Sequence, residues 1–358
     1  MAKIRIGIIG ASLRQGWAGR SHLPALVNHP DCELIAVCTT KQSSADETKQ
    51  KFGAKYAYAD HREMLKNPEV DVVSVVVKVP AHRDPTMDAI AAGKHVYTEW
   101  PLGRTTAEAI EMAKAANAKG IRHMVGLQAR GNPPVRYLRD LVKDGYVGEV
   151  LSARVHMVRD GILSRPSARA WQREDDKGAN ILTIPFGHTI DAFRFVVGEF
   201  DVKRRPLSGT VTTQAKEWLE TDTKNRVPVN APDTVMISGH LKSGAVASAH
   251  IATVPYAGAG YQMEVYGREG TLIVTSEDSP QLRSMRIQGA QKGNELKDLP
   301  VPASYGDAGH GEPGIVGKMY SELAAAIRGN RACETSFDTA VELHHFLDDV
   351  RKASGWKA

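Results

Sequence analysis

Ile4-Arg5-Ile6-Gly7-Ile8-Ile9-Gly10 begins the chain with an apolar run that ends in glycine. A continuous run of this kind, rich in β-branched residues, predicts a strand that is buried on both faces. Stretches of helical pattern separate it from four further runs, at residues 33–38, 71–77, 95–98 and 123–126. Strands that alternate with helices predict an α/β fold, here a doubly wound parallel sheet of the Rossmann type over residues 1–128.

A different pattern follows from residue 129 to residue 358. The prolines Pro133-Pro134 stop regular structure and mark the boundary. Beyond them the expected strands are longer, and Gly267-Arg268-Glu269-Gly270 has the glycines of a tight turn. The expected strands are 150–158, 235–241, 245–252, 261–266, 271–275 and 285–287, and the expected closing helices are 316–328 and 338–354. This segment predicts an α+β domain with a large, mostly antiparallel open sheet.

Composition narrows the class of protein. At 358 residues the chain is long enough for two domains. Its formal net charge is +5, but the basic residues form no run that would bind nucleic acid. No stretch reaches the roughly 18 apolar residues that cross a bilayer, so we expect no membrane partner. Three cysteines make no disulfide framework, and no Cys/His spacing indicates a metal site. A strand at residue 4 leaves no room for a signal peptide, which predicts a cytoplasmic location.

The loop after the first strand contains glycines, which let a backbone approach a pyrophosphate at a helix N-terminus. It stretches the usual G-x-G-x-x-G pattern and has Ser12 in place of the second glycine. Arg14 either covers the phosphates or is a solvated loop residue. The residues predicted to bind the cofactor here are Gly10, Ser12, Leu13, Gly16 and Trp17.

The end of the second strand normally carries an acidic residue to the ribose when the cofactor is NAD. Here it reads Cys38-Thr39-Thr40-Lys41-Gln42, without an acid. The hydroxyl of Thr40 and the ammonium group of Lys41 suit a 2′-phosphate, so NADP is favoured over NAD. An exposed loop lysine is the alternative.

A second segment carries a family resemblance. Residues 92–103 read AGKHVYTEWPLG and resemble the AGKHV-x-x-E-K-P-L segment of the Gfo/Idh/MocA family, the glucose-fructose oxidoreductases and inositol dehydrogenases. The motifs GYVGEV, FGHTID, YGREGTL and SFDTAVELHHFLDDV extend the resemblance over nearly the whole chain. Gly16-Trp17, followed by the sequence His22-Leu23-Pro24-Ala25, is most similar to the branch that contains the fungal galactose-regulon repressor. The resemblance implies a nicotinamide cofactor, a carbohydrate substrate, and a homodimer or homotetramer paired through the open sheet.

The same resemblance implies roles for several residues near the cofactor. Glu99 would contact the nicotinamide ribose, and Val79 and His82 would line the ring. Trp100 stands where the family has its lysine, so it stacks on the ring, walls off the substrate or is structural. Two polar residues follow the last Rossmann strand. Gln128 would lie at the cofactor, and Arg130 would lie at the mouth of the substrate site.

The catalytic groups are incomplete, because the family uses a lysine, an aspartate and a histidine. Ile184 occupies the place of the aspartate. His188 remains as general base or substrate ligand, since an imidazole titrates near neutrality, and Asp191 either orients it or pairs locally. Lys78 ends an apolar strand, where parallel sheets face their ligand, and is a second candidate for the base. Extension of the Lys78 side chain into solvent is the alternative.

Arginines crowd one segment of the second domain: Arg159, Arg165, Arg169 and Arg173, with Trp171 among them. Arginine and tryptophan together suit a carboxylated, sulfonated or phosphorylated sugar, through forked hydrogen bonds and stacking. Trp171 is therefore a candidate substrate contact, and ordinary surface or subunit contacts are the alternative.

Three functions remain open. The first is an NAD(P)-dependent oxidoreductase that acts on a secondary hydroxyl of a sugar or sugar-like polyol. The second is a non-catalytic nicotinamide-binding sensor or regulator, which the branch resemblance favours but the absence of long insertions opposes. The third is a glycosidase that uses tightly bound NAD in an oxidation-elimination mechanism. We favour the oxidoreductase, although two groups that the family uses for this reaction are replaced.

Overall fold

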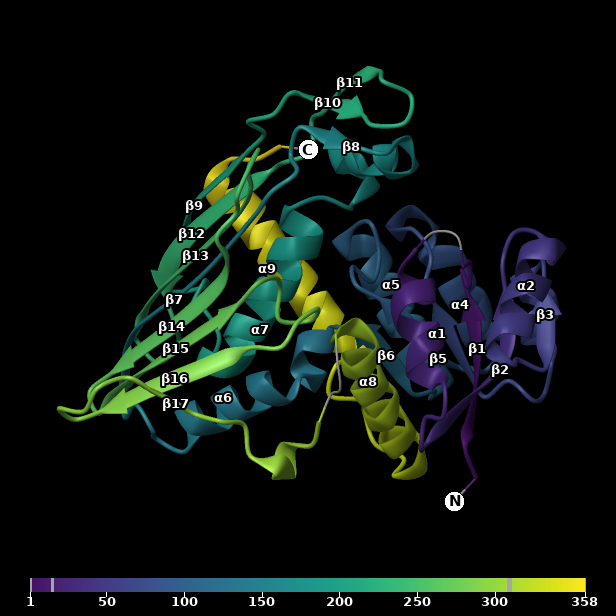
Figure 1. Ribbon diagram of the computed structural model, residues 1–358, viewed down its shortest axis with the longest axis horizontal. Coiled ribbons are helices and arrows are strands. Elements are labelled where there is room, and N and C mark those ends of the chain that lie inside the picture. The colour runs from purple at the N-terminus through teal and green to yellow at the C-terminus, as the bar shows by residue number, and fades with distance from the viewer. Residues whose placement is uncertain (1, 14–15, 308–310, 358) are drawn as a thin grey trace. The chain divides into compact units, whose positions relative to one another are not determined.

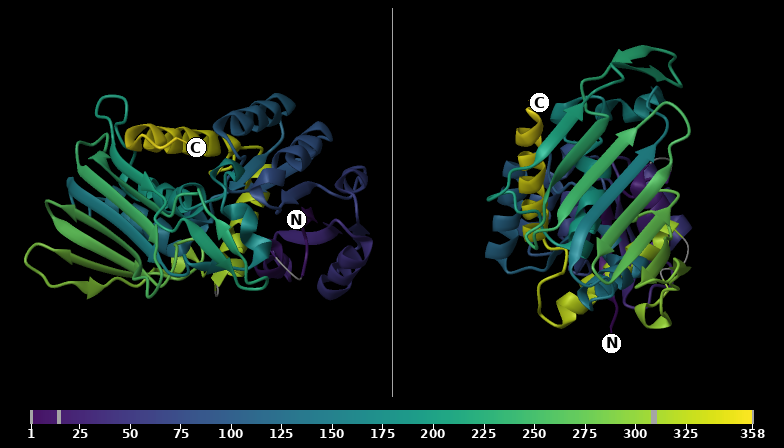
Figure 2. Two further views of the ribbon diagram at one scale, coloured as in Figure 1. Left: turned by 90° about the horizontal axis from the view of Figure 1, so that it is seen from above. Right: turned by 90° about the vertical axis from the view of Figure 1, so that its left-hand side faces the viewer.

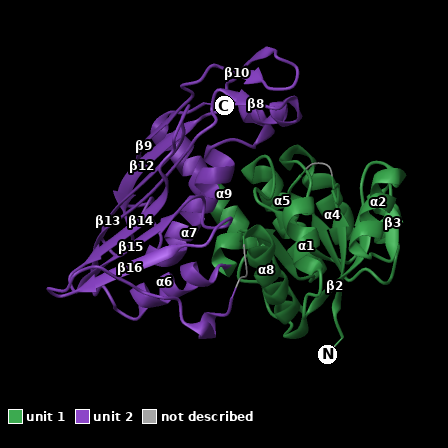
Figure 3. Ribbon diagram, viewed as in Figure 1, with its two compact units in different colours: residues 1–131, 308–344 green, residues 132–307, 345–358 purple. Residues whose placement is uncertain are grey.

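The computed structural model describes residues 2–13, 16–307 and 311–357 (Figure 1). The chain forms two compact units (Figure 3). Unit 1 contains residues 1–131 and 308–344, and unit 2 contains residues 132–307 and 345–358. The predicted α/β class is confirmed, with a parallel sheet in the first unit and a large, mostly antiparallel sheet in the second.

Unit 1 is built on a parallel sheet of six strands in the order β3-β2-β1-β4-β5-β6. Its strands are β1 Ile4–Ile9, β2 Cys32–Cys38, β3 Tyr56–Tyr58, β4 Val72–Val75, β5 His95–Glu99 and β6 His123–Gly126. The short strand β3 was not expected from the sequence. The strand order reverses between β1 and β4, which is where open α/β sheets bind their ligands.

The helices of unit 1 lie between these strands along the chain, except two that follow β6. They are η1 Ala18–His22, α1 Leu23–Leu26, α2 Gln42–Phe52, α3 His61–Leu65, η2 Val79–Ala81, α4 Arg83–Ala91, α5 Thr106–Lys119 and, after β6, η3 Gln128–Gly131 and α8 Gly311–Arg328. α5 begins after Thr105, whose hydroxyl accepts a hydrogen bond from Glu108 N at 3.2 Å, as expected for an N-cap.

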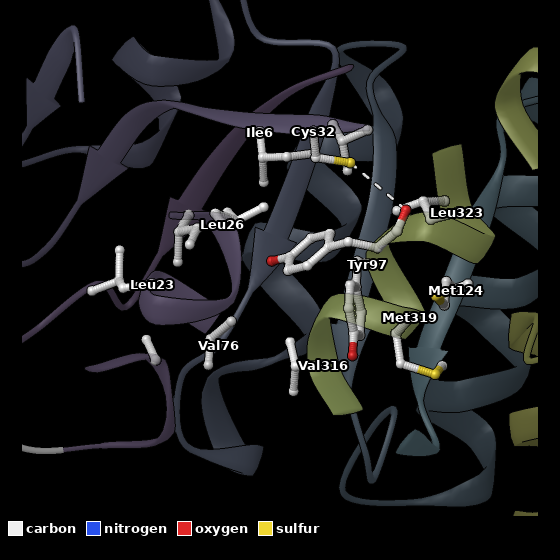
Figure 4. Packing of buried hydrophobic residues seen from close by; sticks show 14 of the residues in the cluster. Ile6, Leu23, Leu26, Cys32, Val76, Tyr97, Met124, Val316, Met319 and Leu323 are labelled. Carbon is white, nitrogen blue, oxygen red and sulfur yellow. Dashed lines mark hydrogen bonds between the residues drawn. The ribbon is translucent and has the colours of Figure 1, made fainter. Parts of the chain in front are cut away.

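α8 returns to unit 1 from far along the chain. Val316, Met319, Tyr320 and Leu323 recur at helical spacing and are buried in the same cluster as Ile6 of β1 (Figure 4). Because this apolar stripe packs on the parallel sheet, residues 308–344 cluster with unit 1 and not with the continuous segment 129–358 expected from the sequence.

Unit 2 is built on a sheet of eight strands in the order β17-β16-β15-β14-β7-β13-β12-β9. They are β7 Val150–Arg159, β9 Ser208–Thr212, β12 Thr234–His240, β13 Val246–Thr253, β14 Gly260–Gly267, β15 Gly270–Ser276, β16 Arg286–Gln291 and β17 Lys297–Asp298. Neighbouring strands are antiparallel except β7 and β13, which run parallel.

Helices cover one face of this sheet, and no helix of the described chain covers the other (Figure 2). The covering helices are α6 Pro133–Lys143, α7 Gly187–Val197 and the second half of α9 Phe337–Ser354. Ala153, Val155 and Met157 of β7 alternate on the covered face and are buried. The helices therefore seal one side of a sheet whose residues alternate between the two faces.

A small second sheet lies in unit 2, with strand order β11-β10-β8. It consists of β8 Ser164–Arg165, β10 Glu217–Glu220 and β11 Arg226–Pro228, and Trp218, Val229 and Ala231 form its own apolar cluster. The short helices of unit 2 are η4 Ser167–Gln172, η5 Asp175–Lys177, η6 Leu182–Phe186 and η7 Ala303–Tyr305. Sequence patterns did not predict this sheet, because its strands are too short to show alternation.

Three properties bear on the broad class of the protein. Within the described residues, no helix is long and apolar enough to cross a membrane. The same part of the chain contains no cluster of three or more His, Cys, Asp or Glu that could hold a metal ion. Cys32, Cys38 and Cys333 are buried thiols, and burial raises the pKa of each to about 12.

Candidate functional site

The loop after β1 brings two strands unusually close together. Gly10 has φ +89°, and a Cβ at this position would lie 2.2 Å from the carbonyl oxygen of Val76. Glycine is therefore required where the ends of β1 and β4 meet. Gly16 has φ +114° with open space around it, and η1 begins at Ala18. The chemistry of this backbone fits a pyrophosphate at the start of a helix.

Other residues predicted for this loop support its shape. Ser12 N donates to the carbonyl of Gly10 at 2.8 Å, and Leu13 packs against the core of unit 1. The Trp17 ring lies 4.9 Å from the guanidinium carbon of Arg20. Arg14 lies outside the described residues.

The end of β2 has no acidic side chain over residues 38–44. Thr40 and Lys41 are exposed there, whereas the hydroxyl of Thr39 donates to the carbonyl of Lys41 at 2.8 Å. The two residues predicted to meet the 2′-position of the ribose are thus open to a ligand.

Glu99 ends β5 and is only 8% exposed. Its carboxylate accepts three hydrogen bonds from the chain itself. His22 Nε2 lies 2.8 Å from Oε1, and Gln128 Nε2 lies 3.0 Å from Oε1 and 2.7 Å from Oε2. The side chain predicted to meet the nicotinamide ribose is therefore held in one orientation before any ligand binds.

Hydrogen bonds continue behind Glu99. A carboxylate only accepts, so His22 Nε2 donates to it. The other ring nitrogen of His22, Nδ1, lies 2.8 Å from Tyr320 Oη, which lies 2.9 Å from Ser74 Oγ. Four elements, β4, α8, η1 and β5, are joined by this chain of hydrogen bonds.

Gly126, at the end of β6, makes room for this arrangement. A Cβ there would lie 2.7 Å from Glu99 Oε1 and 2.8 Å from Gln128 Nε2. Tyr97 lies nearby and is fully buried, and its burial together with the charge of Glu99 holds the pKa of its phenol well above the usual value. Tyr97 therefore stays protonated, and the carboxylate is the charged group at this point of the sheet.

The segment after β4 contains three predicted site residues. Lys78 is exposed and precedes η2, while Val79 is buried. His82 Nδ1 lies 2.8 Å from the carbonyl of Pro101, and its Nε2 lies 3.1 Å from that of Val77. Burial lowers the pKa of His82, so its neutral ring donates to one carbonyl at a time. His82 thus joins the loops that follow β4 and β5.

Trp100 fills the position of the family lysine with a buried indole. It is 4% exposed, and its ring centroid lies 4.8 Å from that of His344, tilted by 51°. Arg130 is half-buried in η3, two residues after Gln128. Unit 1 therefore gathers the predicted cofactor residues at the carboxyl edge of its sheet.

The candidate base lies in unit 2. His188 and Asp191 are both buried on α7, three residues apart and so on one face of the helix. Asn180 Oδ1 accepts hydrogen bonds from Leu182 N at 3.0 Å and Thr183 N at 3.2 Å, which fixes the start of the helical segment that leads into α7.

Asp175 in turn holds Asn180 in place. Its carboxylate accepts from Asn180 Nδ2 at 2.7 Å, from both terminal nitrogens of Arg351 at 3.0 and 3.2 Å, and from Trp356 Nε1 at 3.0 Å. Neither this network nor the one behind Glu99 was found from the sequence, because the partners are far apart along the chain. Trp171, the remaining predicted contact, is half-buried in η4.

Comparison with known proteins matches both units. Residues 4–127 match the family described as "Oxidoreductase family, NAD-binding Rossmann fold" (GFO_IDH_MocA), and residues 133–276 match the "Gal80p, C-terminal domain". The chain joins a Gfo/Idh/MocA Rossmann domain to a Gal80p-like C-terminal domain. The resemblance expected from the sequence is confirmed.

Proteins similar to this chain include enzymes and a regulator. The chain is 27% identical to 1,5-anhydro-D-fructose reductase of Ensifer adhaerens over 88% of its own length and 91% of that protein. It is 24% identical to the galactose/lactose metabolism regulatory protein GAL80 of Saccharomyces cerevisiae, over 68% of its length and 59% of that protein. The solved structure of levoglucosan dehydrogenase in complex with NADH and levoglucosan shares the fold, with TM-score 0.86, 22% identity and coverage of 99% and 98% of the two chains.

Proposed function

We propose that this chain is an NAD(P)-dependent oxidoreductase that acts on a secondary hydroxyl of a sugar or sugar-like polyol. The observation that carries the proposal is the fixed carboxylate of Glu99, at the carboxyl edge of a Gfo/Idh/MocA Rossmann sheet. A relative supports it, since the chain is 27% identical to a sugar reductase over 91% of that protein.

The residues of unit 1 fit a nicotinamide dinucleotide. The loop from Gly10 to Trp17 would hold the pyrophosphate, and Glu99 would accept hydrogen bonds from the ribose hydroxyls. When bound, the nicotinamide supplies hydride transfer. The chain contributes position, because His22 and Gln128 hold Glu99 still and no reorganisation is needed on binding.

We propose that His188 is the base that takes up the proton of the substrate hydroxyl. A neutral imidazole accepts the hydroxyl proton as the alcohol is oxidised and returns it in the reverse direction. Asp191 would orient the ring, and the exposed Lys78 is the second candidate for this task. Substrate contacts are proposed for Trp100, Arg130 and Trp171.

For the cofactor, we propose NADP over NAD. The end of β2 offers the exposed Thr40 and Lys41 and no carboxylate that would repel a 2′-phosphate. Lys41→Gln should lower kcat/KM for NADP by about ten-fold, the cost of one charged hydrogen bond, and leave that for NAD unchanged. Equal effects on both cofactors would contradict the assignment.

We also propose a homodimer or homotetramer through the uncovered face of the eight-stranded sheet. Met236, Val246 and Tyr266 are exposed on β12, β13 and β14. Beside them, Arg154 and Glu264 neutralise each other, with Arg154 N–H donating at 2.8 Å. Light scattering should give a multiple of the chain mass for the wild type and a smaller mass for Met236→Lys. The cytoplasmic location stays a prediction.

The test of function is cofactor reduction at 340 nm, with NAD and NADP separately, across neutral and acidic sugars. Turnover that is lost in His188→Ala and kept in His345→Ala, an exposed histidine on α9, would support the proposal. Tight cofactor binding without turnover would overturn it in favour of a regulator. Cleavage of a chromogenic glycoside with bound NAD would favour the glycosidase.

A further inference from the structure

We propose that unit 2 carries a binding site, centred on Arg165, for the oxyanion group of a small ligand: a carboxylate, sulfonate or phosphate. Arg165 ends β8 in the small three-stranded sheet and is followed by Pro166 and η4. Its backbone pairs in register with Glu220 of β10, and its carbonyl accepts a hydrogen bond from Thr221 N at 3.1 Å. The backbone that carries this guanidinium group is therefore fixed by the sheet.

The guanidinium group of Arg165 lies over an aromatic ring. Its guanidinium carbon lies 4.8 Å from the centroid of Trp218, which is buried in the apolar cluster of the small sheet. A cation–π contact of this kind attracts the guanidinium to the ring without using its hydrogen-bond donors. The five N–H donors point outward from the edge of the group.

Few of these donors are used by the chain. One terminal nitrogen donates to Gln172 Oε1 at 3.3 Å, and the buried Nε has no hydrogen-bond partner within the described residues. Among those residues, no carboxylate lies within ion-pairing distance of Arg165. A largely enclosed guanidinium thus has its charge uncompensated, which is costly unless an anion completes it.

The charges that act on Arg165 are positive. Burial together with the neighbouring guanidiniums of Arg169 and Arg159 lowers the pKa of Arg165 to about 10. Carboxylates near these residues have partners of their own. Asp278 pairs with Arg159 at 3.1 Å, and Asp222 accepts hydrogen bonds from the backbone and hydroxyl of Ser167. The positive charges of Arg169 and Arg159 next to the enclosed Arg165 favour a ligand that brings its own negative charge.

The geometry of the guanidinium group defines the class of ligand that Arg165 would bind. Arginine binds carboxylates and phosphates through two parallel N–H···O bonds, which a neutral hydroxyl cannot match. The anionic group of a sugar acid or sugar phosphate would accept the unused hydrogen bonds of Arg165. The polyol part of the same ligand would then be available for other contacts. That this ligand is the enzyme's substrate rests on the proposed function, whereas the oxyanion site does not.

Isothermal titration calorimetry on the full chain without cofactor tests the site directly. The probes are D-glucuronate and inorganic sulfate, with D-glucose as the neutral counterpart. Arg165→Met keeps an unbranched side chain as far as the position of Nε and removes the charge. Arg268→Met is the matched control, since Arg268 is exposed in the turn between β14 and β15 and pairs with Glu149.

We expect wild-type chain and Arg268→Met to bind D-glucuronate and sulfate equally. Arg165→Met should bind both at least ten-fold more weakly, the cost of one charged hydrogen bond, with any D-glucose binding unchanged. Equal weakening in the two variants, or no binding of either anion by the wild type, would overturn the proposal. If Arg165→Met does not fold, the exposed Arg169→Gln replaces it, with a few-fold loss expected and no loss counting against the site. Because no turnover is measured, failure of the proposed oxidation leaves this result intact.

Discussion

Two enclosed charges, Glu99 in unit 1 and Arg165 in unit 2, are treated in opposite ways by the fold. Glu99 accepts three hydrogen bonds from His22 and Gln128, and its partners are held by further residues behind them. Arg165 has one long hydrogen bond, an aromatic ring on its face and other guanidiniums nearby. A charge removed from water needs partners. Unit 1 supplies them from its own chain, and unit 2 leaves them to a ligand.

This difference separates stability from recognition. Because Glu99 is satisfied before a cofactor arrives, removing it damages the folded state itself. Because Arg165 is not satisfied, removing it damages binding and costs the free protein little. The same change, loss of one enclosed charge, should therefore have unequal consequences in the two units.

The largest effect is expected from Glu99→Leu. The substitution leaves the N–H groups of His22 and Gln128 buried without an acceptor, and each buried donor left without a partner costs about 1–3 kcal/mol. Urea unfolding should show this loss, and the KM for the cofactor should rise as well.

Glu99→Gln sharpens this result. A glutamine can accept from His22 with its oxygen and donate to a turned Gln128 carboxamide, so the expected loss is about 1 kcal/mol, near the net value of one hydrogen bond. Equal losses for the two variants would mean that the donors behind Glu99 contribute nothing.

The next largest loss of stability is expected from Tyr320→Phe. This substitution removes the hydroxyl that joins Ser74 to His22 but keeps the ring. The expected loss is about 1–2 kcal/mol by urea unfolding, from one bridging group with two partners. A double-mutant cycle with Glu99→Gln should give a coupling energy of at least about 0.5 kcal/mol, because the two sites share one network. Additive losses would show that the chain of hydrogen bonds does not act as a unit.

The sequence predicted the framework because its signals are local. The apolar runs that form β1, β2, β4, β5 and β6 are each visible within a few residues. Glu99 and Gln128 were predicted as site residues because a family motif marks them. Tyr320, by contrast, is 298 residues from His22, and no single-sequence pattern links such positions.

In unit 2 the same limit applies to the arginines. The sequence showed that they crowd one segment, but only the structure brings Trp218 of β10 against Arg165 of β8. Strands of two to four residues have no readable alternation, so this pairing could not be predicted. The partners of Asp175, at positions 351 and 356, are equally remote.

Acid should weaken unit 1 through His95, which is half-buried, and His123, which is buried. Burial lowers the pKa values of His95 and His123, and each Nδ1 accepts a backbone N–H, from Arg122 at 2.9 Å and Phe337 at 3.0 Å. Between the lowered pKa values and the usual value near 6.5, the unfolded chain binds more protons. The free energy of unfolding should therefore rise with pH over that window.

Urea unfolding at several pH values between 5 and 8 checks this expectation. His123→Gln should reduce the slope of stability against pH, and the exposed His345→Gln should leave it unchanged. A flat profile in the wild type would mean that these rings titrate normally in the folded chain.

The smallest effect on the free protein is expected from Arg165→Met, and it is the sharpest way to break the comparison. Enclosing a charge without an acidic partner costs free energy, so removing the charge offsets the lost contact between the guanidinium and Trp218. Methionine keeps an unbranched side chain as far as the position of Nε. The free energy of unfolding without ligand should change by less than about 1 kcal/mol, in either direction. Sulfate, which binds the folded state, should stabilise the wild type and not the variant. A large loss of stability in the variant would mean that Arg165, like Glu99, is satisfied by its own fold, and the two units would then follow one rule.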